Sequence, residues 1–555
     1  MVKEIQITAT PAEEKNSAII NSKLFESLKK SGINPGNKEV QFIQNKRSID
    51  ARHGKVKLFL KYTAYIGEPA PDPNTNLLPE WINIKNANSK FCGKTVIIVG
   101  GGPAGIFAAL KLLEKGIKPV IIERGSDTQT RKRDIAAIST KHIVDENSNY
   151  CFGEGGAGTF SDGKLFTRSS KRGNVGRIMQ IFTHFGADPK IITDAHPHIG
   201  TNKLPAIINS MNKLIIESGG EIYFNTKVIS FNIQKSVEYS TCVKYSICKN
   251  ICNGVKTVNT KTGEEKIFTA HKIILATGHS ATDIYMILAK EFPESLEAKT
   301  FAVGMRVEHP REIIDKIQYK DNAKNMNAAE YRLTCQQEDR GVYSFCMCPG
   351  GFVVPSATGP NQIVVNGMSA AARNSLWSNA AIVVETRPQD IPQEFEQKAE
   401  QAGTKEIKGL LWRTWLEELT YQNGSKQQAP AQLLKDFLEC KLSSELPRTS
   451  YTPGIVSSNI AKWFPEQLTK RLIPGFRQFN NLMKGFICDQ ALLIASETRT
   501  STPVRIKRDD KTYECVAVKN LFPCGEGSGY SGGIVSSAMD GENAAEKIIE
   551  CFEKN

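Results

Sequence analysis

The sequence predicts an α/β protein organised around a buried parallel β-sheet, and three stretches support this prediction. The first, residues 94–125, reads as a β-branched apolar strand (Thr95–Val99), a glycine turn, an amphipathic helix and a second strand (Val120–Ile122). The second is the apolar run Ile273–Leu275, which leads into Ala-Thr-Gly. The third, residues 519–550, reads as a short strand, a glycine-rich loop and a long helix. Short apolar strands that alternate with helices are typical of a sheet covered by helices.

The turn in the first stretch has the spacing G-x-G-x-x-G at Gly100, Gly102 and Gly105. The first glycine allows a tight turn, the second lets the backbone approach a pyrophosphate, and the third lets the helix pack closely on the strand. The free N–H groups at the helix N-terminus favour phosphate. Glu123 ends the second strand, where its carboxylate can accept a hydrogen bond from a ribose hydroxyl. Together these features predict a dinucleotide site, and a glycine turn without phosphate is the alternative.

Composition is typical of a globular protein with two or three domains. The chain has 555 residues, of which 40% are hydrophobic and 23% charged. No apolar run approaches the length of a membrane span, and the N-terminal sequence MVKEIQITATPAEEK lacks the apolar region of a signal peptide. The cysteines number 13 and follow no regular spacing, which indicates reduced thiols. We therefore expect a cytoplasmic protein.

The formal net charge of +13 raises the question of an acidic partner. Because the basic residues are spread along the chain, we expect a lysine-rich surface and no nucleic-acid partner. His196 and His198 have no further histidine or cysteine at ligand spacing, so we expect no metal site.

The pattern of elements divides the chain into five segments. Residues 1–66 read as a small α+β module, and residues 67–93, rich in proline and asparagine, as a linker. Residues 94–300 read as the first part of a dinucleotide-binding domain. Residues 301–490 read as an inserted substrate or cap domain, and residues 491–555 as the return to the first domain.

Within these segments, the sequence also predicts individual elements. The inserted domain is expected to have strands over residues 301–375 and polar helices over residues 385–446. In the N-terminal module we expect a strand, a helix and a strand pair at Lys3–Thr8, Ala18–Lys30, Glu39–Ile43 and Lys55–Ile66. The turn between the paired strands gathers four charged residues and a histidine, Arg47, Asp50, Arg52, His53 and Lys55. A solvated hairpin is the expected interpretation, and a surface that docks on the main body is the alternative.

A second glycine-rich stretch, residues 149–168, repeats the same glycine spacing from Gly153 to Gly158. No β-branched strand precedes it and no helical periodicity follows, so it is a poor second nucleotide turn. We interpret it as an extended loop that passes close to a ligand, where side chains would collide. Lys164 and Arg168 are either anion contacts in this loop or solvated charges.

The chain resembles the uncharacterised bacterial FAD-dependent dehydrogenases (NAD(P)/FAD-dependent oxidoreductases) in motifs that span nearly its whole length. These motifs are RSIDAR, EGGAGTFSDGKL, PHIGTNKL, GHSATD, YSFCMCPGG, NGMS, ETRTSTPVRI and CGEGSGYSGGI. The family belongs to the flavoproteins with two dinucleotide-binding domains. The resemblance implies a discontinuous Rossmann-like FAD-binding domain, an inserted α+β substrate or cap domain and a small N-terminal α+β module.

In flavoproteins of this type, the first glycine turn holds the FAD pyrophosphate and the acid at the strand end holds the adenosine ribose. A C-terminal G-[DE] loop holds the flavin side, and the helix after it aims its N-terminus at the N1/O2 edge of the ring. By this resemblance, the cofactor-binding residues are expected to be Gly100, Gly102, Pro103, Ala104, Gly105, Glu123, Arg124, Arg133, Gly155, Gly156, Gly158, Thr159, Ser161, Gly278, Gly525, Glu526, Gly532, Gly533 and Ile534.

The chain differs from the disulfide reductases of similar fold in two respects. It has no second intact strand–turn–helix–strand unit for NADPH, and it has no C-x-x-C pair. Cys346 and Cys348 are separated by one residue, which is too tight for an unstrained disulfide. We therefore expect structural or substrate-facing thiols, with NAD(P)H left open as a transient electron donor.

Five residues are candidates for chemistry beside a flavin. Arg306 and Arg499 could anchor a carboxylate, and structural ion pairs are the alternative. His279, Tyr343 and Tyr530 could exchange a proton near the ring. The alternatives are that His279 caps the following helix and that both tyrosines pack with satisfied hydroxyls.

The sequence thus predicts an oxidoreductase that transfers a hydride between a small organic substrate and non-covalent FAD. One alternative is a FAD-dependent enzyme that modifies tRNA, which would also account for the net charge of +13. Another is a flavin-bearing sensor or scaffold without enzymatic activity. A dehydrogenase that uses nicotinamide alone is disfavoured by the C-terminal glycine loop. The substrate, the direction of electron flow and the oligomeric state are left open.

Overall fold

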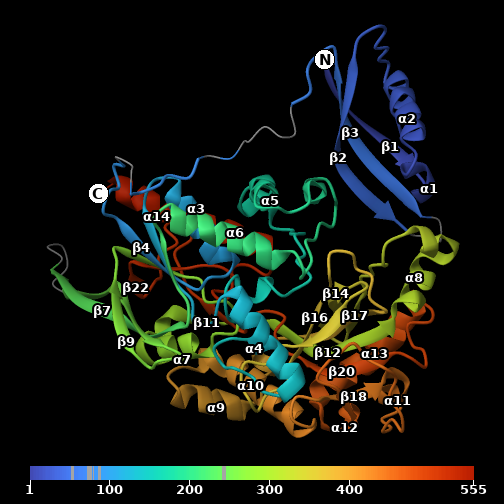
Figure 1. Ribbon diagram of the computed structural model, residues 1–555. Helices are drawn as coiled ribbons and strands as arrows, with labels where there is room; N and C mark the ends of the chain where they lie inside the picture. Colours follow the sequence, from blue (N-terminus) through green and yellow to red (C-terminus); the bar gives the residue numbers. More distant parts are fainter. Residues whose placement is uncertain (52–55, 72–77, 79, 86–88, 240–245, 555) are drawn as a thin grey trace.

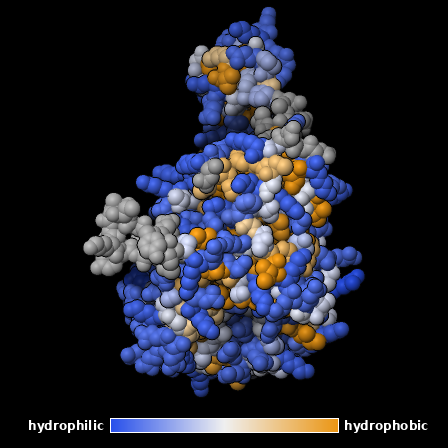
Figure 2. All heavy atoms as spheres, turned by 90° about the vertical axis from the view of Figure 1, so that its left-hand side faces the viewer, coloured by the Kyte–Doolittle hydropathy of each residue, from blue (hydrophilic) through white to orange (hydrophobic). Residues whose placement is uncertain are grey.

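The computed structural model describes residues 1–51, 56–71, 78, 80–85, 89–239 and 246–554 (Figure 1). A small N-terminal unit stands out from a larger body, and the space-filling view shows the same arrangement (Figure 2). Hydrophilic side chains cover most of the face seen in Figure 2, and the hydrophobic ones on it occur in small groups. Within the described part of the chain, no helix is both long and apolar enough to cross a membrane.

The N-terminal unit is a three-stranded antiparallel sheet with two helices, and its strand order is β1-β3-β2. Its elements are β1 (Val2–Ala9), α1 (Pro11–Glu14), α2 (Ser17–Lys30), β2 (Val40–Asp50) and β3 (Lys57–Ile66). Alternate residues of β1 and β3 pack against the apolar stripe of α2, so the unit has a core of its own. The expected first strand and helix are confirmed. The second strand is longer than expected.

The charged turn expected between β2 and β3 is only partly a turn. Arg47 and Asp50 lie within β2, because pairing with β3 continues as far as Asp50 and Lys57. Arg52, His53 and Lys55 lie outside the described residues.

The described residues around this turn dock on the main body. The backbone N–H of Arg47 donates to Thr193 O at 2.8 Å, and the N–H of Ala195 donates to Arg47 O at 2.9 Å. Val56 is buried in a hydrophobic cluster of the main body together with Ile314 of helix α8 (Arg311–Tyr319). These contacts favour the docking interpretation over a solvated hairpin.

The main body contains a five-stranded parallel sheet with the order β23-β10-β4-β5-β6. Its strands are β4 (Thr95–Val99), β5 (Lys118–Ile122), β6 (Glu221–Tyr223), β10 (Lys272–Leu275) and β23 (Leu521–Pro523). The three stretches that predicted a buried parallel sheet supply four of these strands side by side. The α/β class with a discontinuous Rossmann-like sheet is therefore confirmed.

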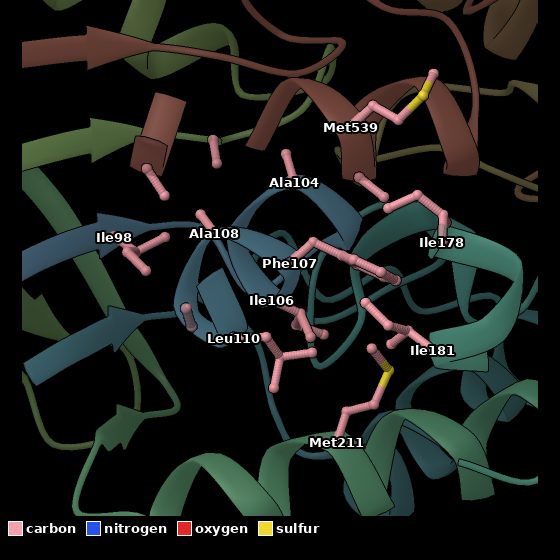
Figure 3. Packing of buried hydrophobic residues seen from close by; sticks show 14 of the residues in the cluster. Ile98, Ala104, Ile106, Phe107, Ala108, Leu110, Ile178, Ile181, Met211 and Met539 are labelled. Carbon is pink, nitrogen blue, oxygen red and sulfur yellow. The ribbon is translucent and has the colours of Figure 1, made fainter. Parts of the chain in front are cut away.

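Helices cover one face of this sheet. They are α3 (Pro103–Leu113), α5 (Val175–His184), α6 (Leu204–Glu217) and α14 (Ile534–Lys554). Figure 3 shows Phe107 of α3 pointing toward Ile178 and Ile181 of α5, with Met211 of α6 and Met539 of α14 nearby. Val96 and Ile98 of β4 face this helical layer, whereas Ile97 and Val99 face the opposite layer.

The opposite layer consists of a β-meander, a two-stranded sheet and helix α7. The bounds of these elements are β7 (Thr226–Tyr239), β8 (Ser246–Asn259), β9 (Glu265–Thr269), β22 (Val518–Lys519), α7 (Thr282–Glu291), β11 (Leu296–Ala298) and β21 (Val504–Ile506). Helix α4 (Thr128–Lys141) lies after β5. Since both faces are covered, the near-continuous apolar runs of the central strands are explained.

The second half of the body is a seven-stranded sheet with the order β13-β14-β17-β12-β20-β18-β19. Its strands are β12 (Phe301–Pro310), β13 (Thr334–Gln337), β14 (Arg340–Cys348), β17 (Trp377–Thr386), β18 (Ala429–Leu433), β19 (Ile455–Ser457) and β20 (Leu492–Glu497), and the hairpin β15 (Phe352–Pro355) and β16 (Val365–Met368) lies beside them. Its helices are α8 (Arg311–Tyr319), α9 (Gln393–Gln401), α10 (Lys408–Gln422), α11 (Leu434–Leu438), α12 (Ile460–Trp463) and α13 (Glu466–Leu482).

Two expectations for this half need correction. The stretch expected to be helical over residues 385–446 contains strand β18, whose first residues are all buried and pair with β19 and β20. Strand β20 lies beyond residue 490, the expected end of the inserted domain, yet it pairs with β12 inside the seven-stranded sheet. All six residues of β20 are buried, which agrees with the position of this strand in the interior of the seven-stranded sheet.

Close packing between α3 and α14 gives a test of the fold. A Cβ atom added to Gly541 would lie 2.0 Å from the carbonyl oxygen of Ala104, so the two helix backbones touch at this glycine. We expect Gly541→Ala to lower the free energy of unfolding by about 1–3 kcal/mol, because the helices must separate. The measurement is the midpoint of thermal unfolding.

Gly176→Ala in α5 is the matched control for Gly541→Ala. Gly176 is exposed, and its added Cβ would meet only the Asn174 side chain at 3.3 Å. This variant should unfold at or above the wild-type temperature, because alanine favours helix. Equal midpoints for the two variants would contradict the proposed contact.

Candidate functional site

A cleft of about 380 Å³ opens at the carboxyl ends of the central parallel strands. The last residues of β4 and β5, Val99 and Ile122, line it, as do the segments that follow β10 and β23. Carboxyl ends of parallel strands in an open sheet form a crevice where the chain leaves neighbouring strands in opposite directions. Here β4 lies between β10 and β5, so the crevice is built by segments far apart in the sequence.

The structure brings most of the expected cofactor-binding residues to this cleft. The lining includes Gly100, Gly102, Pro103, Ala104, Glu123, Arg124, Gly156, Gly158, Ser161, Gly278, Gly525, Glu526, Gly532, Gly533 and Ile534. Four expected residues, Gly105, Arg133, Gly155 and Thr159, do not line it. Gly105 instead packs helix on strand, since an added Cβ would lie 2.0 Å from Gly100 O.

Two helices begin at the cleft. Helix α3 starts at Pro103 after Gly102, which provides no side-chain cap, and α14 starts at Ile534 after Gly533. Unpaired N–H groups and the positive end of the helix dipole therefore face the cleft from two sides. This arrangement favours an anionic ligand.

Three glycines, Gly102, Gly278 and Gly532, expose their backbone to the same cleft. An added Cβ at Gly278 or Gly532 would meet no heavy atom within 4 Å, and at Gly102 it would meet only Gly156 Cα, at 3.8 Å. These glycines are therefore not required by protein packing, and their Cα atoms face the space of the cleft. Gly278 has a φ of +72°, which by itself favours glycine, whereas a ligand that approaches the backbone closely explains Gly102 and Gly532.

Glu123 links three glycine-containing backbone segments through hydrogen bonds to its carboxylate. Its buried carboxylate accepts hydrogen bonds from three backbone N–H groups, those of Gly101 at 2.8 Å, Gly125 at 3.0 Å and Gly153 at 2.9 Å. A carboxylate can accept about four hydrogen bonds. One acceptor position thus remains at a side chain that lines the cleft.

The second glycine loop braces the first. The N–H of Gly155 donates to Gly101 O at 2.9 Å, and an added Cβ at Gly156 would lie 3.0 Å from Gly102 Cα. Gly155 has a φ of +77°, and its added Cβ would strike the hydroxyl of Thr159. The loop needs glycine for backbone contact as well as for proximity to the cleft.

Arg131 is a buried residue at this site that the sequence analysis missed in favour of Arg133. Arg133 lies on the exposed face of α4, whereas Arg131 is fully buried. The Arg131 guanidinium donates to the carbonyl oxygens of Asn149, Tyr150 and Glu154 at 2.7–3.0 Å. It thereby holds the segment that carries the second glycine loop.

Helical spacing was the signal that could have identified Arg131. It shares the buried face of α4 with Ile135 and Ile138. Burial lowers the pKa of Arg131 to about 10, against the opposing effect of nearby carboxylates.

Arg124 and Arg499 line the cleft, but both are largely committed to protein partners. Arg124 donates to Asp283 at 2.9 Å and lies over the ring of Phe152. Arg499 binds both oxygens of the buried Glu417, at 2.9 and 2.7 Å. Among the described residues, its remaining nitrogen, Nη1, has only the thiol of Cys151 at 3.6 Å as a partner.

The Glu417 carboxylate stays ionised in this ion pair. Burial by itself would raise the pKa of Glu417, but the charges of Arg499 and Arg413 lower it by more. Arg499 is thus both an ion-pair partner and a cation at the cleft wall.

His279 also lines the cleft. Its Nδ1 lies 3.7 Å from a carboxylate oxygen of Glu526, which lines the cleft too. Helix α7 begins after Ala281 and has no side-chain cap, so the alternative that His279 caps this helix is wrong.

The other three catalytic candidates lie outside the cleft lining. Arg306 is fully buried and pairs with Glu497 at 2.7 Å and Asn379 at 2.6 Å. Tyr343 packs beside buried aliphatic residues of the seven-stranded sheet. The Tyr530 hydroxyl accepts from the backbone N–H of Arg508 at 3.1 Å. These contacts match the alternatives given for both residues: Arg306 is in a structural ion pair, and Tyr530 has a satisfied hydroxyl.

Lys164 and Cys346 line the cleft as well. The ammonium group of Lys164 lies 3.8 Å from Cys346 Sγ, 3.6 Å from Cys348 Sγ and 3.1 Å from an Asp162 oxygen. Arg168 is exposed and does not contribute to the lining. In the described part of the chain, no group of three or more acidic, histidine or cysteine side chains is arranged to hold a metal ion.

The cleft fits a dinucleotide in its chemistry. It combines two helix N-termini, glycine backbone that faces open space, and a strand-end carboxylate with an acceptor position left. FAD has an anionic pyrophosphate and a ribose hydroxyl to match the first and last of these features.

Comparisons with known families point to the same ligand. Residues 94–140 match a family model described as FAD binding domain, and residues 300–500 match one described as FAD-dependent protein, C-terminal domain-like. Residues 1–65 match a domain of unknown function.

The chain is similar to a known protein in sequence and to solved structures in fold. A protein of Clostridium beijerinckii, named only "Uncharacterized protein", is 36% identical over 524 residues, which cover 92% of each chain. Among solved structures, tetracycline destructase Tet(51) matches at 10% identity and a TM-score of 0.31, covering 83% of this chain and 88% of that chain. Thermovibrio ammonificans THI4 matches at 16% identity and a TM-score of 0.23, covering 36% of this chain and 62% of that chain.

The two FAD family matches agree with the geometry of the cleft, and the relative matches over 92% of each chain. The chain belongs to the family of FAD-dependent proteins that includes the Clostridium beijerinckii protein.

Proposed function

We propose that the protein is an oxidoreductase that transfers a hydride between a small organic substrate and non-covalently bound FAD. The observation that carries the proposal is the convergence of the N-termini of α3 and α14 with Glu123 on one cleft. The motifs that resemble bacterial FAD-dependent dehydrogenases support the choice of reaction. We also propose a cytoplasmic location, which is supported by the free thiols of the described cysteines.

The residues divide into those for the adenosine half and those for the flavin half of FAD. Glu123 has an acceptor position left for a ribose hydroxyl, and the N-terminus of α3 supplies N–H groups for the pyrophosphate. The segment after β23 and the N-terminus of α14 would serve the flavin half. This segment is fixed because Asp540 accepts the N–H of Gly525 at 2.7 Å and is itself paired with Arg508 at 2.7 Å.

FAD, when bound, supplies the centre that accepts or donates a hydride. The protein side chains would then bind the substrate and accept or donate the proton that it exchanges. His279 is placed to hold or move a proton at its imidazole, and a Glu526 carboxylate oxygen lies 3.7 Å from its Nδ1. Arg499 presents Nη1 at the cleft wall for an anionic substrate group, while Glu417 keeps the guanidinium in place.

The absorption spectrum of the purified protein tests the proposal. We expect the bands of an oxidised flavin, either as purified or after FAD is added. Absence of flavin under both conditions would overturn the proposed function.

Anaerobic addition of NADH or NADPH then separates two versions of the function. Bleaching of the flavin would identify a nicotinamide as the electron donor and leave an acceptor to be found. A flavin that stays oxidised would indicate an organic donor, which a metabolite screen can identify.

Glu123→Gln tests the cofactor site directly. Glutamine has one acceptor oxygen and places an NH₂ group against backbone donors that the carboxylate satisfied. We expect the Kd for FAD to rise at least about tenfold, or about 1.4 kcal/mol, as measured by flavin fluorescence titration.

Glu146→Gln is the matched control, because Glu146 is an exposed glutamate in the segment after α4. It should bind FAD with wild-type affinity. If Glu123→Gln also binds FAD normally, the carboxylate does not organise the site.

A further inference from the structure

A cluster of two thiols and an ammonium group lies at the cleft and has no role in the cofactor site described above. Cys346 and Lys164 line the cleft, and Cys348 is buried behind them. Lys164 Nζ lies within 4 Å of both sulfur atoms. No other cysteine of the described chain has a lysine ammonium at such a distance among its hydrogen bonds.

The backbone turns Cys346 out of the regular strand. The pairing of β14 with β17 shifts register between Phe345 and Cys348, which is a β-bulge. Cys346 has a φ of +44°, a left-handed conformation that a residue with a side chain rarely adopts. Such conformations persist where the surroundings fix them, and they gather at functional sites.

Two hydrogen bonds fix this conformation. Arg306 donates to the carbonyl oxygen of Cys346 at 3.2 Å, and the Cys348 thiol donates to the same oxygen at 3.3 Å. Arg306 is itself held by Glu497. The buried ion pair thus supports the bulge and leaves the Cys346 side chain at the cleft.

The surroundings favour the thiolate form of Cys346. The neighbouring Cys348 thiol, followed by the charges of Lys164 and Arg306, holds the pKa of Cys346 well below its usual value, although burial opposes them. The same pairing raises the pKa of Cys348, which therefore keeps its proton. The charged or titratable groups that act on Cys346 are Lys164, Asp162, Arg306, Cys348 and Glu497, and Arg373 acts on Lys164.

We propose that Cys346 is a nucleophile of the cleft that reacts with carbon electrophiles conjugated to a carbonyl group. Lys164 lies beside its sulfur atom, where it can donate a hydrogen bond to the carbonyl oxygen of the electrophile. Phe166 and Phe345 also line the cleft and offer flat apolar surface for a conjugated ligand.

The reaction is an addition without oxidation or reduction. The sulfur electron pair forms a bond to the β-carbon, and the π electrons of the C=C bond move toward the carbonyl oxygen. The developing negative charge is stabilised by the Lys164 ammonium group, and the α-carbon then takes a proton from water. The product is a thioether at Cys346.

Acrylamide, a conjugated amide, is the probe for the test. The wild-type protein is treated across pH 5–9, and the modification rate of each cysteine is followed by peptide mass spectrometry. At pH 6 we expect Cys346 to react about tenfold faster than the exposed Cys92 and Cys440, because more of it is thiolate. Its rate should also level off at a lower pH than theirs.

Variants of Lys164 test the origin of this reactivity. Lys164→Met should slow the modification of Cys346 at pH 6 about tenfold and move its pH profile upward, whereas Lys164→Arg should stay within about twofold of wild type. Lys171→Met, which changes an exposed lysine further along the chain, is the matched control and should leave the rate unchanged. Thermal unfolding of each variant identifies any loss of fold.

Two results would overturn the proposal. One is a Cys346 rate at pH 6 no greater than that of Cys92 or Cys440 in the wild-type protein. The other is a folded Lys164→Met variant with an unchanged rate. Neither measurement depends on flavin reduction, so the outcome is separate from that of the proposed oxidoreductase.

Discussion

The site depends on one buried carboxylate that joins three backbone segments. Glu123 accepts N–H groups from the first glycine turn, from the residue that follows its own strand, and from the second glycine loop. Each of these N–H groups would be unsatisfied in the interior without it, at a cost of about 1–3 kcal/mol apiece. The glycines around them let the backbones meet at close range. The shape of the cleft therefore follows from hydrogen bonding as much as from apolar packing.

The sheet explains why distant parts of the chain share this cleft. Strands β4, β5, β10 and β23 run parallel, so the loops after them emerge at the same edge. Helix α14, the last element, returns to pack on α3 through Gly541, which brings its N-terminus beside that of α3. Two positive helix ends then face one ligand site.

The second half of the body supplies the opposite wall and neutralises most of its own charge. Arg306 and Arg499 are each paired with a buried glutamate, which offsets the desolvation of both groups. This half presents one guanidinium nitrogen of Arg499 and the Cys346 thiol at the cleft, and the half with the parallel sheet adds the His279 imidazole and the Lys164 ammonium group. A cleft wall with so few polar groups suits a small polar substrate better than it suits a macromolecular partner.

The sequence by itself determined the first strand–turn–helix–strand unit, the C-terminal loop and helix, and most of the glycines at the cleft. These features are local, because periodicity and glycine spacing reflect contacts between residues close in the chain. Tertiary structure alone decided the rest. It buried Arg131 instead of Arg133, made residues 429–433 a strand, and left Arg306 and Tyr530 outside the cleft lining. It also set Lys164 beside Cys346. Each of these outcomes depends on partners distant in sequence, and a single sequence does not specify which distant segments will meet.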